Sequence, residues 1–457
     1  MFSKLIGNIF PTTKFYFKWP ISFSTFMIFV IMILIIMFDS LKIVEGCSSR
    51  KVLEDTITER PGSKPTEQPK PAVEQPQCKP YTGDSINPVA GLTTNEWRTR
   101  YKMAMLLGGS ADAIGYYRGR WEFQLKGQII HDEVKAKGGI KSLNVSKPNW
   151  TLSDDTIMHL ATGEAITEYI KTSANDLEKL YITIAKHYIK CMLDMVDRAP
   201  GTTTMKTVAM LDANDPKGYI IPFDDRGGGC GGAMRSMCIG LLYPDPKQLD
   251  LLIAVSIESG RMTHNHPTGF LGSLTSALFT HYAIQGKPVH MWGAGLMETL
   301  DKAWQYVNKV GRDVEKNKGA WSYFRDSWSR YLKIRCLEGG TQPLFPSPYG
   351  VRERDKFYKE ISFDGWGGAS GHDAPMIAYD AFVGAGNSWE ELANRAFFHG
   401  GDSDSTAIIA ATWFAISYGH KDVPVNNYQY LEYRDRLETV GEEIFNYVEK
   451  YFNEPKM

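Results

Sequence analysis

Two short acidic clusters, about 250 positions apart, constrain this chain more than any other feature of its sequence. The first is Ser-Asp-Asp-Thr over residues 153–156, and the second is Gly-Gly-Asp-Ser-Asp-Ser-Thr over residues 400–406. Apolar residues follow the first cluster at steps of three and four, and the run 407–416 after the second is almost entirely apolar. These patterns predict one amphipathic helix and one helix buried on all sides. Each acidic cluster therefore stands at the N-terminus of a core helix.

The simplest interpretation of either cluster is helix capping, in which Ser and Asp side chains accept hydrogen bonds from the first backbone N–H groups. Capping does not account for all four carboxylates, which belong to Asp154, Asp155, Asp402 and Asp404. If the two helix starts met in the core, these carboxylates would repel one another unless a cation offset their charge. An all-oxygen set of ligands suits Mg²⁺ or Mn²⁺, whereas Zn²⁺ recruits His or Cys. The clusters together therefore predict a site for two hard divalent cations.

A glycine-rich stretch lies between the two clusters. Gly227, Gly228 and Gly229 precede an apolar pattern that predicts a helix, and such a loop brings backbone N–H groups close to an anion. Neither a dinucleotide-binding fold nor a P-loop fits, because no strand is expected before these glycines and no Lys-Ser/Thr pair follows them. Cys230 and Cys238 have small or apolar neighbours, so we interpret both as core thiols.

The chain resembles the ADP-ribosylarginine hydrolases in five segments: SDDTIMHLATGEA, GGGCGGAMRSMCIGL, SIESGRMTHNHPTGFLG, GWGGASGHDAPMIAYDA and ELANRAFFHGGDSDSTA. That group belongs to the ADP-ribosyl-acceptor hydrolase family, together with the dinitrogenase reductase-activating glycohydrolases. The resemblance runs from about Trp97 to about Tyr447, in the family's motif order. It implies a single all-α domain, monomeric, with two Mg²⁺ ions at the bottom of an ADP-ribose cleft.

The resemblance also implies the metal ligands and the reaction. The ligands fall on Ser153, Asp154, Asp155, Asp402, Asp404 and Ser405. The family reaction hydrolyses the N-glycosidic bond between the distal ribose and the guanidino nitrogen of a modified arginine, which releases ADP-ribose and restores the protein's arginine. Cleavage of a ribosyl C–N bond passes through an oxocarbenium-like state, and a metal ion can lower the pKa of the attacking water. Asp154 or Asp155 is the candidate base, and the sequence leaves that choice open.

A third acid and the substrate contacts are implied in the same way. Glu122 corresponds to an acid on a mobile loop beside the metals, although without the resemblance it is equally a solvated charge between Trp121 and Phe123. Asp112 is expected to support the site rather than act in it. The expected contacts with ADP-ribose are Phe223, Gly227, Gly228, Gly229, Thr263, His264, Phe363, Gly365, Gly367, Gly368, Ser370, Gly371 and His372. Phe223 and Phe363 are the candidate partners for adenine stacking.

Residues 91–457 are expected to form this one domain. Strand-like alternation is scarce and helical spacing recurs, for example over residues 177–196, so an all-α fold is favoured independently of the resemblance. The 457 residues carry a net charge of −1 and no basic stripe, which excludes nucleic acid as a partner.

The first 46 residues predict a membrane segment. No charged residue interrupts positions 19–38, a length that can span a bilayer. The segment is either a signal anchor or a signal peptide cleaved before Cys47. Both alternatives predict a membrane-anchored, lumenal or extracellular protein, and the protein is cytosolic if the segment is not used.

Residues 47–90 are predicted to be a disordered tether, because Pro, Lys, Glu, Thr and Gln dominate their composition. Cys47 and Cys78 lie near its two ends, and in an oxidising lumen they could pair with each other or between molecules. Two N-x-S/T sequons, at Asn144 and Asn149, are candidate glycosylation sites in that compartment.

Three functions remain open at this point. The first is an active ADP-ribosylarginine hydrolase, and the second is a non-catalytic relative that only binds ADP-ribose. The third is a hydrolase of the same fold that acts on serine-linked ADP-ribose or on O-acetyl-ADP-ribose. The four intact aspartates favour catalysis, and the residues of the five segments favour the arginine linkage. No residue excludes the serine linkage.

Overall fold

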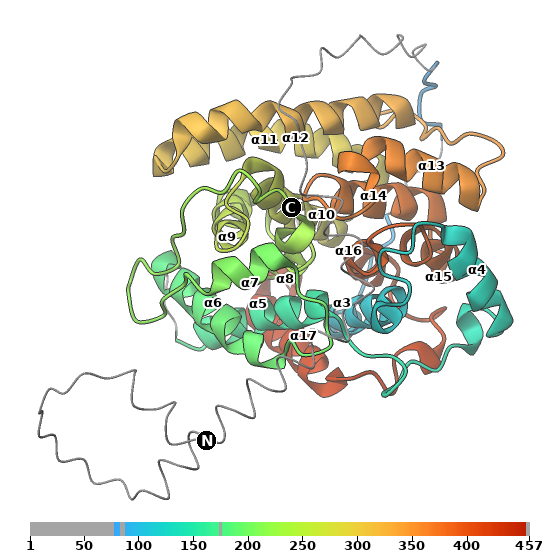
Figure 1. Cartoon of the computed structure of the whole chain (residues 1–457), viewed down its shortest axis with the longest axis horizontal. Coiled ribbons are helices and arrows are strands. Elements are labelled where there is room, and N and C mark those ends of the chain that lie inside the picture. The colour runs from blue at the N-terminus through green and yellow to red at the C-terminus, as the bar shows by residue number, and fades with distance from the viewer. Residues whose placement is uncertain (1–76, 83–86, 173–175, 454–457) are drawn as a thin grey trace, which may run out of the picture. The chain divides into compact units, whose positions relative to one another are not determined.

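The all-helical prediction is confirmed. The computed structural model describes residues 77–82, 87–172 and 176–453, and this part of the chain contains helices and isolated β-bridges but no strand (Figure 1). The helices are α3 (Thr94–Tyr116), α4 (Gly127–Ala136), α5 (Asp154–Ile170), α6 (Leu177–Cys191), α7 (Thr202–Val208), α8 (Met237–Leu242), α9 (Leu249–Arg261), α10 (Pro267–Gln285), α11 (Trp292–Val310), α12 (Val314–Arg335), α13 (Val351–Ile361), α14 (Asp373–Ala385), α15 (Trp389–Leu392), α16 (Ser403–Tyr418), α17 (Arg434–Val448) and α18 (Lys450–Asn453).

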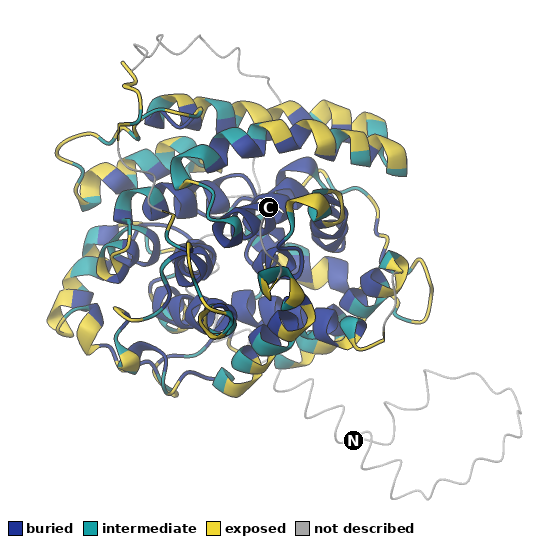
Figure 2. Ribbon diagram, turned by 180° about the vertical axis from the view of Figure 1, so that it is seen from behind, coloured by how far each residue is buried: buried dark blue, intermediate teal, exposed yellow. Residues whose placement is uncertain are grey.

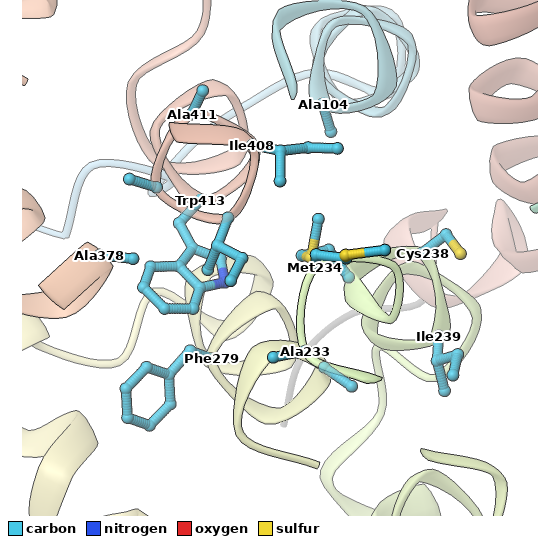
Figure 3. Close-up of a cluster of buried hydrophobic side chains, with 14 of the residues drawn as sticks. Ala104, Ala233, Met234, Cys238, Ile239, Phe279, Ala378, Ile408, Ala411 and Trp413 are labelled. Atoms are coloured by element: carbon cyan, nitrogen blue, oxygen red, sulfur yellow. The ribbon is translucent and has the colours of Figure 1, made fainter. Parts of the chain in front are cut away.

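The core is built around α16, the helix that the apolar run predicts. Every residue of α16 except Tyr418 is buried, and the helix packs against α3, α10 and α14. Trp413 of α16 contacts Phe279 of α10 with ring centroids 5.3 Å apart, while Ile408 lies on the side of α16 that faces Ala104 of α3 (Figure 3). A helix that is apolar all round needs such neighbours on every side.

The helices at the edge of the domain have one buried and one exposed face. Helices α11 and α12 run side by side, and their outward residues are exposed while their inward residues are buried (Figure 2). Helix α5 is instead largely buried and packs against α6 and α17. The acidic cluster at its start therefore enters the interior, as the sequence pattern predicts.

A glycine decides how closely α3 approaches the start of α16. A Cβ atom added at Gly115 would lie 2.6 Å from the backbone oxygen of Ser403, which is too close for any side chain. Where two backbones approach this closely, only glycine fits. Gly115 thereby holds the second acidic cluster against the end of α3.

The expected pairing of Cys78 is wrong. Cys78 forms a disulfide with Cys336, 258 residues later, and not with Cys47 or with a second molecule. Backbone hydrogen bonds from Tyr81 N–H to Gly340 (3.0 Å) and from Gln342 N–H to Lys79 (2.8 Å) hold the two segments together. The sequence could not show this contact, because Cys336 lies just after α12, far along the chain. Cys47 lies outside the described residues.

Removal of this disulfide should lower the stability of the domain. We expect Cys336→Ser to reduce the free energy of unfolding by about 3 kcal/mol, because a cross-link over a long loop restricts the unfolded chain. Urea unfolding would measure the loss. Cys78→Ser should give the same loss, and the double variant should lose no more stability than either single variant. Cys191→Ser, which changes a free and half-buried cysteine, should leave the free energy of unfolding unchanged. Equal stability of the oxidised and reduced wild-type protein would contradict the expectation.

The predicted membrane segment at 19–38 and most of the tether lie outside the described residues. No helix in the described ranges combines the length and apolar character needed to cross a bilayer.

Candidate metal centre and cleft

The first acidic cluster is fixed by hydrogen bonds at the start of α5. Ser153 is the N-cap: its hydroxyl accepts from Asp155 N–H (3.1 Å) and donates to the Oδ1 of Asp112 (2.5 Å). The Oδ2 of Asp112 accepts from Ser153 N–H (3.1 Å) and from the Thr156 hydroxyl. Asp112 thus has the supporting role expected from the sequence, and Ser153 is fully buried among these partners.

The second cluster meets the first. Asp402 is the N-cap of α16 and accepts from Ser405 N–H (3.3 Å), while the Ser405 hydroxyl donates to Oδ2 of Asp155 (2.7 Å) across 250 residues. One carboxylate oxygen from each of Asp155, Asp402 and Asp404 lies within 4.8 Å of the others, and all three residues are buried. The predicted meeting of the two helix starts is therefore confirmed for these carboxylates.

Burial and mutual repulsion disfavour charge on these groups. Burial, and then the charges of Asp154 and Asp402, raise the pKa of Asp155 well above its usual value. The pKa of Asp404 is raised by burial and then by Glu122 and Asp155, and that of Asp154 by burial and then by Asp112 and Asp402. At neutral pH this arrangement is costly without a compensating cation.

The donor set fits a hard divalent cation. The group offers carboxylate oxygens from three aspartates, with a fourth carboxylate, Asp154, and the Ser405 hydroxyl beside it. Oxygen ligands of this kind suit Mg²⁺ or Mn²⁺ better than Zn²⁺.

The cluster opens into a cleft with a cavity volume of about 200 Å³. Its lining comes from seven separate segments of the chain. The lining residues are Glu122, Phe123, Asp154, Asp155, Ala199, Gly201, Thr202, Thr203, Thr204, Gly229, Cys230, Gly231, Met234, His264, Ala369, Asp402 and Ser405.

Glu122 lies at this cleft, as the resemblance implies. A short antiparallel bridge holds its loop on the second cluster, with hydrogen bonds from Phe123 N–H to Gly401 (2.7 Å) and from Gly401 N–H to Gln124 (3.0 Å). Trp121 anchors the loop to the domain, because its side chain is buried and its indole N–H donates to Glu133 (2.9 Å). Glu122 therefore faces the aspartates, and its charge contributes to the raised pKa of Asp404.

The two glycine-rich loops lie side by side. Gly229 and Ser370 form a bridge, Gly371 N–H donates to Gly228 (2.9 Å), and the Ser370 hydroxyl donates to the same carbonyl (3.0 Å). The second loop also reaches the three-carboxylate group, because Asp402 N–H donates to the Gly367 carbonyl (2.7 Å). The structure thus joins both predicted substrate-binding loops to the carboxylate group.

His264 forms the wall behind the first loop. A Cβ atom at Gly231 would lie 2.4 Å from Cε1 of His264, so only glycine fits at this position of the loop. Burial, and then the nearby charge of Arg235, lower the pKa of His264 to about 3, which keeps the imidazole neutral at physiological pH. Thr263 shares a 2.7 Å hydrogen bond with its Nδ1. His264 lines the cavity beside the aspartates, whereas Thr263 contacts His264 from outside the lining.

The remaining predicted contacts lie outside the cavity lining. Phe223 packs near His266, and Phe363 is 53% exposed near Tyr323, so both rings are outside the deep part of the cleft. His372 is buried and bonds the Ser370 hydroxyl (2.9 Å), which gives it a role in holding the loop.

Asp373, which follows His372, was not among the predicted site residues. Its carboxylate accepts from the backbone N–H groups of Phe363 (2.9 Å), Gly368 (3.1 Å) and Ser370 (3.0 Å), which fixes the loop that contains Gly365 and Gly367. Burial raises the pKa of Asp373 to about 8, while these three hydrogen bonds favour its charged form.

The interpretation of Cys230 as a core thiol is wrong. Its thiol lies 3.3 Å from the Oδ2 of Asp402 and 3.6 Å from the Ser405 hydroxyl, and the residue lines the cleft. Small neighbours suggested a core position, but they are the glycines of the cleft wall. Cys238 is buried, as expected.

An ion pair that the sequence analysis missed clamps the turn before α5. Arg198 pairs with Glu432 at 2.8 Å, and both side chains are almost fully buried. Arg198 donates to the Leu152 carbonyl (2.8 Å), Glu432 accepts from Leu152 N–H (3.1 Å), and the Arg198 carbonyl accepts from Asp154 N–H (3.0 Å). Residues from three distant segments therefore set the position of Asp154.

Removal of this clamp should be costly. We expect Glu432→Ala to lower the free energy of unfolding by about 3 kcal/mol, because it leaves the buried Arg198 guanidinium without its main partner. Chemical unfolding would measure the change. Glu438→Ala, which removes a partner of the more exposed Arg434, should cost less than about 1 kcal/mol. Equal losses in the two variants would show that the buried pair is not a clamp.

Comparison with known proteins identifies the family of this chain. Residues 93–453 match the model of the ADP-ribosylglycohydrolase family. The chain is 44% identical over 368 residues to a Dictyostelium discoideum protein named ADP-ribosylhydrolase ARH1, covering 76% of this chain and 93% of that relative.

Two further relatives are more distant. A mimivirus protein named putative ADP-ribosyl glycohydrolase L444, from Acanthamoeba polyphaga mimivirus, is 30% identical over 348 residues, covering 71% of this chain and 66% of the relative. A Xenopus tropicalis protein named ADP-ribosylhydrolase ARH3 is 25% identical over 292 residues, covering 60% and 76%. With the family match spanning most of the chain and the buried carboxylate group in place, this chain belongs to the ADP-ribosylglycohydrolase family.

Proposed function

We propose that the protein hydrolyses the N-glycosidic bond of ADP-ribosylated arginine in proteins, releasing ADP-ribose and restoring the arginine. The observation that carries this proposal is the meeting of Asp155, Asp402 and Asp404 at the base of a cleft whose walls are the two glycine-rich loops. The identity of 44% with a relative named ADP-ribosylhydrolase ARH1 supports the same reaction class.

The proposed cofactor is a pair of Mg²⁺ ions, with Mn²⁺ as a substitute. Asp155, Asp402 and Asp404 would hold one ion, and the remaining oxygens of Asp154, Ser405 and Ser153 are the candidate ligands for the second. When bound, the ions supply positive charge that lowers the pKa of a water molecule and attracts the ribose hydroxyls.

The two adjacent aspartates have different surroundings, which suggests different roles. Asp155 belongs to the three-carboxylate group and accepts from the Ser405 hydroxyl, so we assign it to holding the cation. Asp154 lines the cleft outside that group, so we assign it to orienting and deprotonating the attacking water. Glu122, which also lines the cleft, is proposed to close the site over the ribose.

The walls of the cleft offer matching contacts for the rest of ADP-ribose. The loop of Gly227, Gly228 and Gly229 is proposed to take the diphosphate, since backbone N–H groups can approach an anion closely there. Neutral His264 is proposed to hydrogen-bond a ribose hydroxyl. Phe223 and Phe363, outside the deep cavity, are proposed to stack on the adenine.

Release of ADP-ribose tests the proposal. The full chain is incubated with Mg²⁺ or with EDTA and three substrates: an arginine-modified protein, a serine-modified peptide and O-acetyl-ADP-ribose. The proposal expects Mg²⁺-dependent release that is fastest from arginine. Faster release from serine or from the acetyl ester would assign a different linkage to the same site. Binding of ADP-ribose without turnover on any of the three would indicate a non-catalytic relative.

A further inference from the structure

The disulfide between Cys78 and Cys336 points to the compartment in which the domain matures. Cys78 is exposed and Cys336 is buried, with their Cα atoms 5.5 Å apart. Disulfides form and persist in secreted and lumenal proteins, whereas the cytosol keeps most thiols reduced. The pair joins the segment before the domain to the end of α12, so it is part of the fold and distant in sequence from the catalytic clusters.

The burial of the other cysteines is compatible with an oxidising environment. In the described part of the chain the free cysteines are Cys191, Cys230 and Cys238, and none of them is exposed. The exposed cysteine in this part of the chain is Cys78, and it is paired. Reactivity of a thiol depends on its access to solvent, so this arrangement limits unwanted oxidation and exchange.

The two sequons give an independent observation. Asn144 and Asn149 are both exposed, in the irregular segment between α4 and α5, so an attached oligosaccharide meets solvent rather than the core. Their neighbours hold this segment in place, because Val145 N–H donates to Asn426 (2.9 Å) and Trp150 N–H donates to Ser146 (3.0 Å). Neither asparagine is among the residues that line the cleft. Both side chains are therefore accessible for attachment of a bulky group from solvent.

We propose that the domain matures in an oxidising compartment that attaches N-linked oligosaccharides, and that Asn144 and Asn149 are the attachment sites. In this step the side-chain amide nitrogen of each asparagine forms a bond to C1 of the first sugar. The bond from C1 to the diphosphate of a lipid-linked oligosaccharide breaks, the lipid diphosphate leaves, and the amide nitrogen gives up one proton. If the proposed hydrolase activity is also correct, the substrates are extracytoplasmic proteins that carry modified arginine.

The test uses the full chain, expressed in a secreting eukaryotic cell. Digestion with an N-glycan-specific endoglycosidase should increase the electrophoretic mobility of the wild-type protein. Thr151→Ala and Ser146→Ala should each remove one of two mobility steps, while the matched variants Thr151→Ser and Ser146→Thr, which keep the sequons, should retain both. Alkylation of the denatured, unreduced protein should leave Cys78 and Cys336 unlabelled.

Two results would overturn the proposal. One is a wild-type chain whose mobility the endoglycosidase does not change, and the other is a chain in which Cys78 and Cys336 are both alkylated without reduction. Neither readout depends on enzyme activity, so failure here is distinct from failure of the proposed reaction. Turnover of a small arginine-linked substrate should be equal in Thr151→Ala and Thr151→Ser, because the side chain of Thr151 does not line the cleft.

Discussion

Asp155→Asn is expected to abolish both turnover and stabilisation by the Mg²⁺ ion held at Asp155, Asp402 and Asp404, whereas Asp154→Asn is expected to abolish turnover and leave stabilisation by that ion in place. Asp155 shares its site with Asp402 and Asp404, so its loss removes a ligand of the cation. Charge supplied by a metal ion is worth several kcal/mol in the transition state. Because about 1.4 kcal/mol corresponds to a tenfold change in rate, we expect kcat to fall by roughly a thousandfold or more.

Asp154 should behave differently, because it lies outside the three-carboxylate group. Loss of a general base typically lowers the rate by about 10²- to 10⁴-fold. Thermal unfolding with increasing Mg²⁺ measures cation binding, and ADP-ribose release measures turnover. Asp112→Asn provides a control for disturbance of the turn, since Asp112 binds the same backbone without lining the cleft. If Asp154→Asn lost the response to Mg²⁺ and Asp155→Asn kept it, the two assignments would be reversed.

The metal-free protein is expected to lose stability as the pH rises, and Mg²⁺ is expected to restore it. The pKa values of Asp154, Asp155 and Asp404 are raised above the value of 3.8 for an unperturbed Asp, with burial as the largest cause. The folded state therefore binds protons more tightly than the unfolded state. The stabilising contribution is complete below about pH 4 and is lost as the pH rises through the folded-state pKa values.

Comparison with a variant isolates this effect from the titration of other groups. In EDTA at pH 7.5, Asp155→Asn/Asp404→Asn should be more stable than the wild type, because the two amides replace buried carboxylates whose charges are disfavoured by burial and by their neighbours. The difference should shrink towards pH 4. Added Mg²⁺ should reverse it, because a ligand at 100 times its Kd stabilises the folded wild type by about 2.7 kcal/mol. A wild type that remains the more stable protein in EDTA at pH 7.5 would contradict the expectation.

The elements that the sequence predicts best are those with local causes. The starts of α5 and α16 follow from N-cap side chains, Ser153 and Asp402, and from the apolar spacing that comes directly after them. The excess of carboxylates over the needs of capping predicted that the two starts meet, and they do. The two glycine-rich loops became interpretable as one binding surface through the family resemblance, which implied both of them.

The features that the sequence analysis missed all depend on contacts between distant segments. Cys230 appeared apolar because its neighbours are small, but packing of its loop against α16 brings the thiol to Asp402. The pairing of Cys78 depends on where α12 ends, and the clamp of Arg198 and Glu432 depends on how the segment before α17 meets the turn before α5.

The sequence by itself determined the helical class, the positions of the two acidic helix starts and the type of cation that their oxygens suit. Periodicity, capping and ligand chemistry are properties of neighbouring residues, so they are visible without a fold. Only the tertiary structure decided which carboxylate stands apart from the group of three, which thiol faces the site and which cysteine closes the disulfide. Those outcomes depend on distances between atoms hundreds of residues apart, which are fixed only when the helices pack.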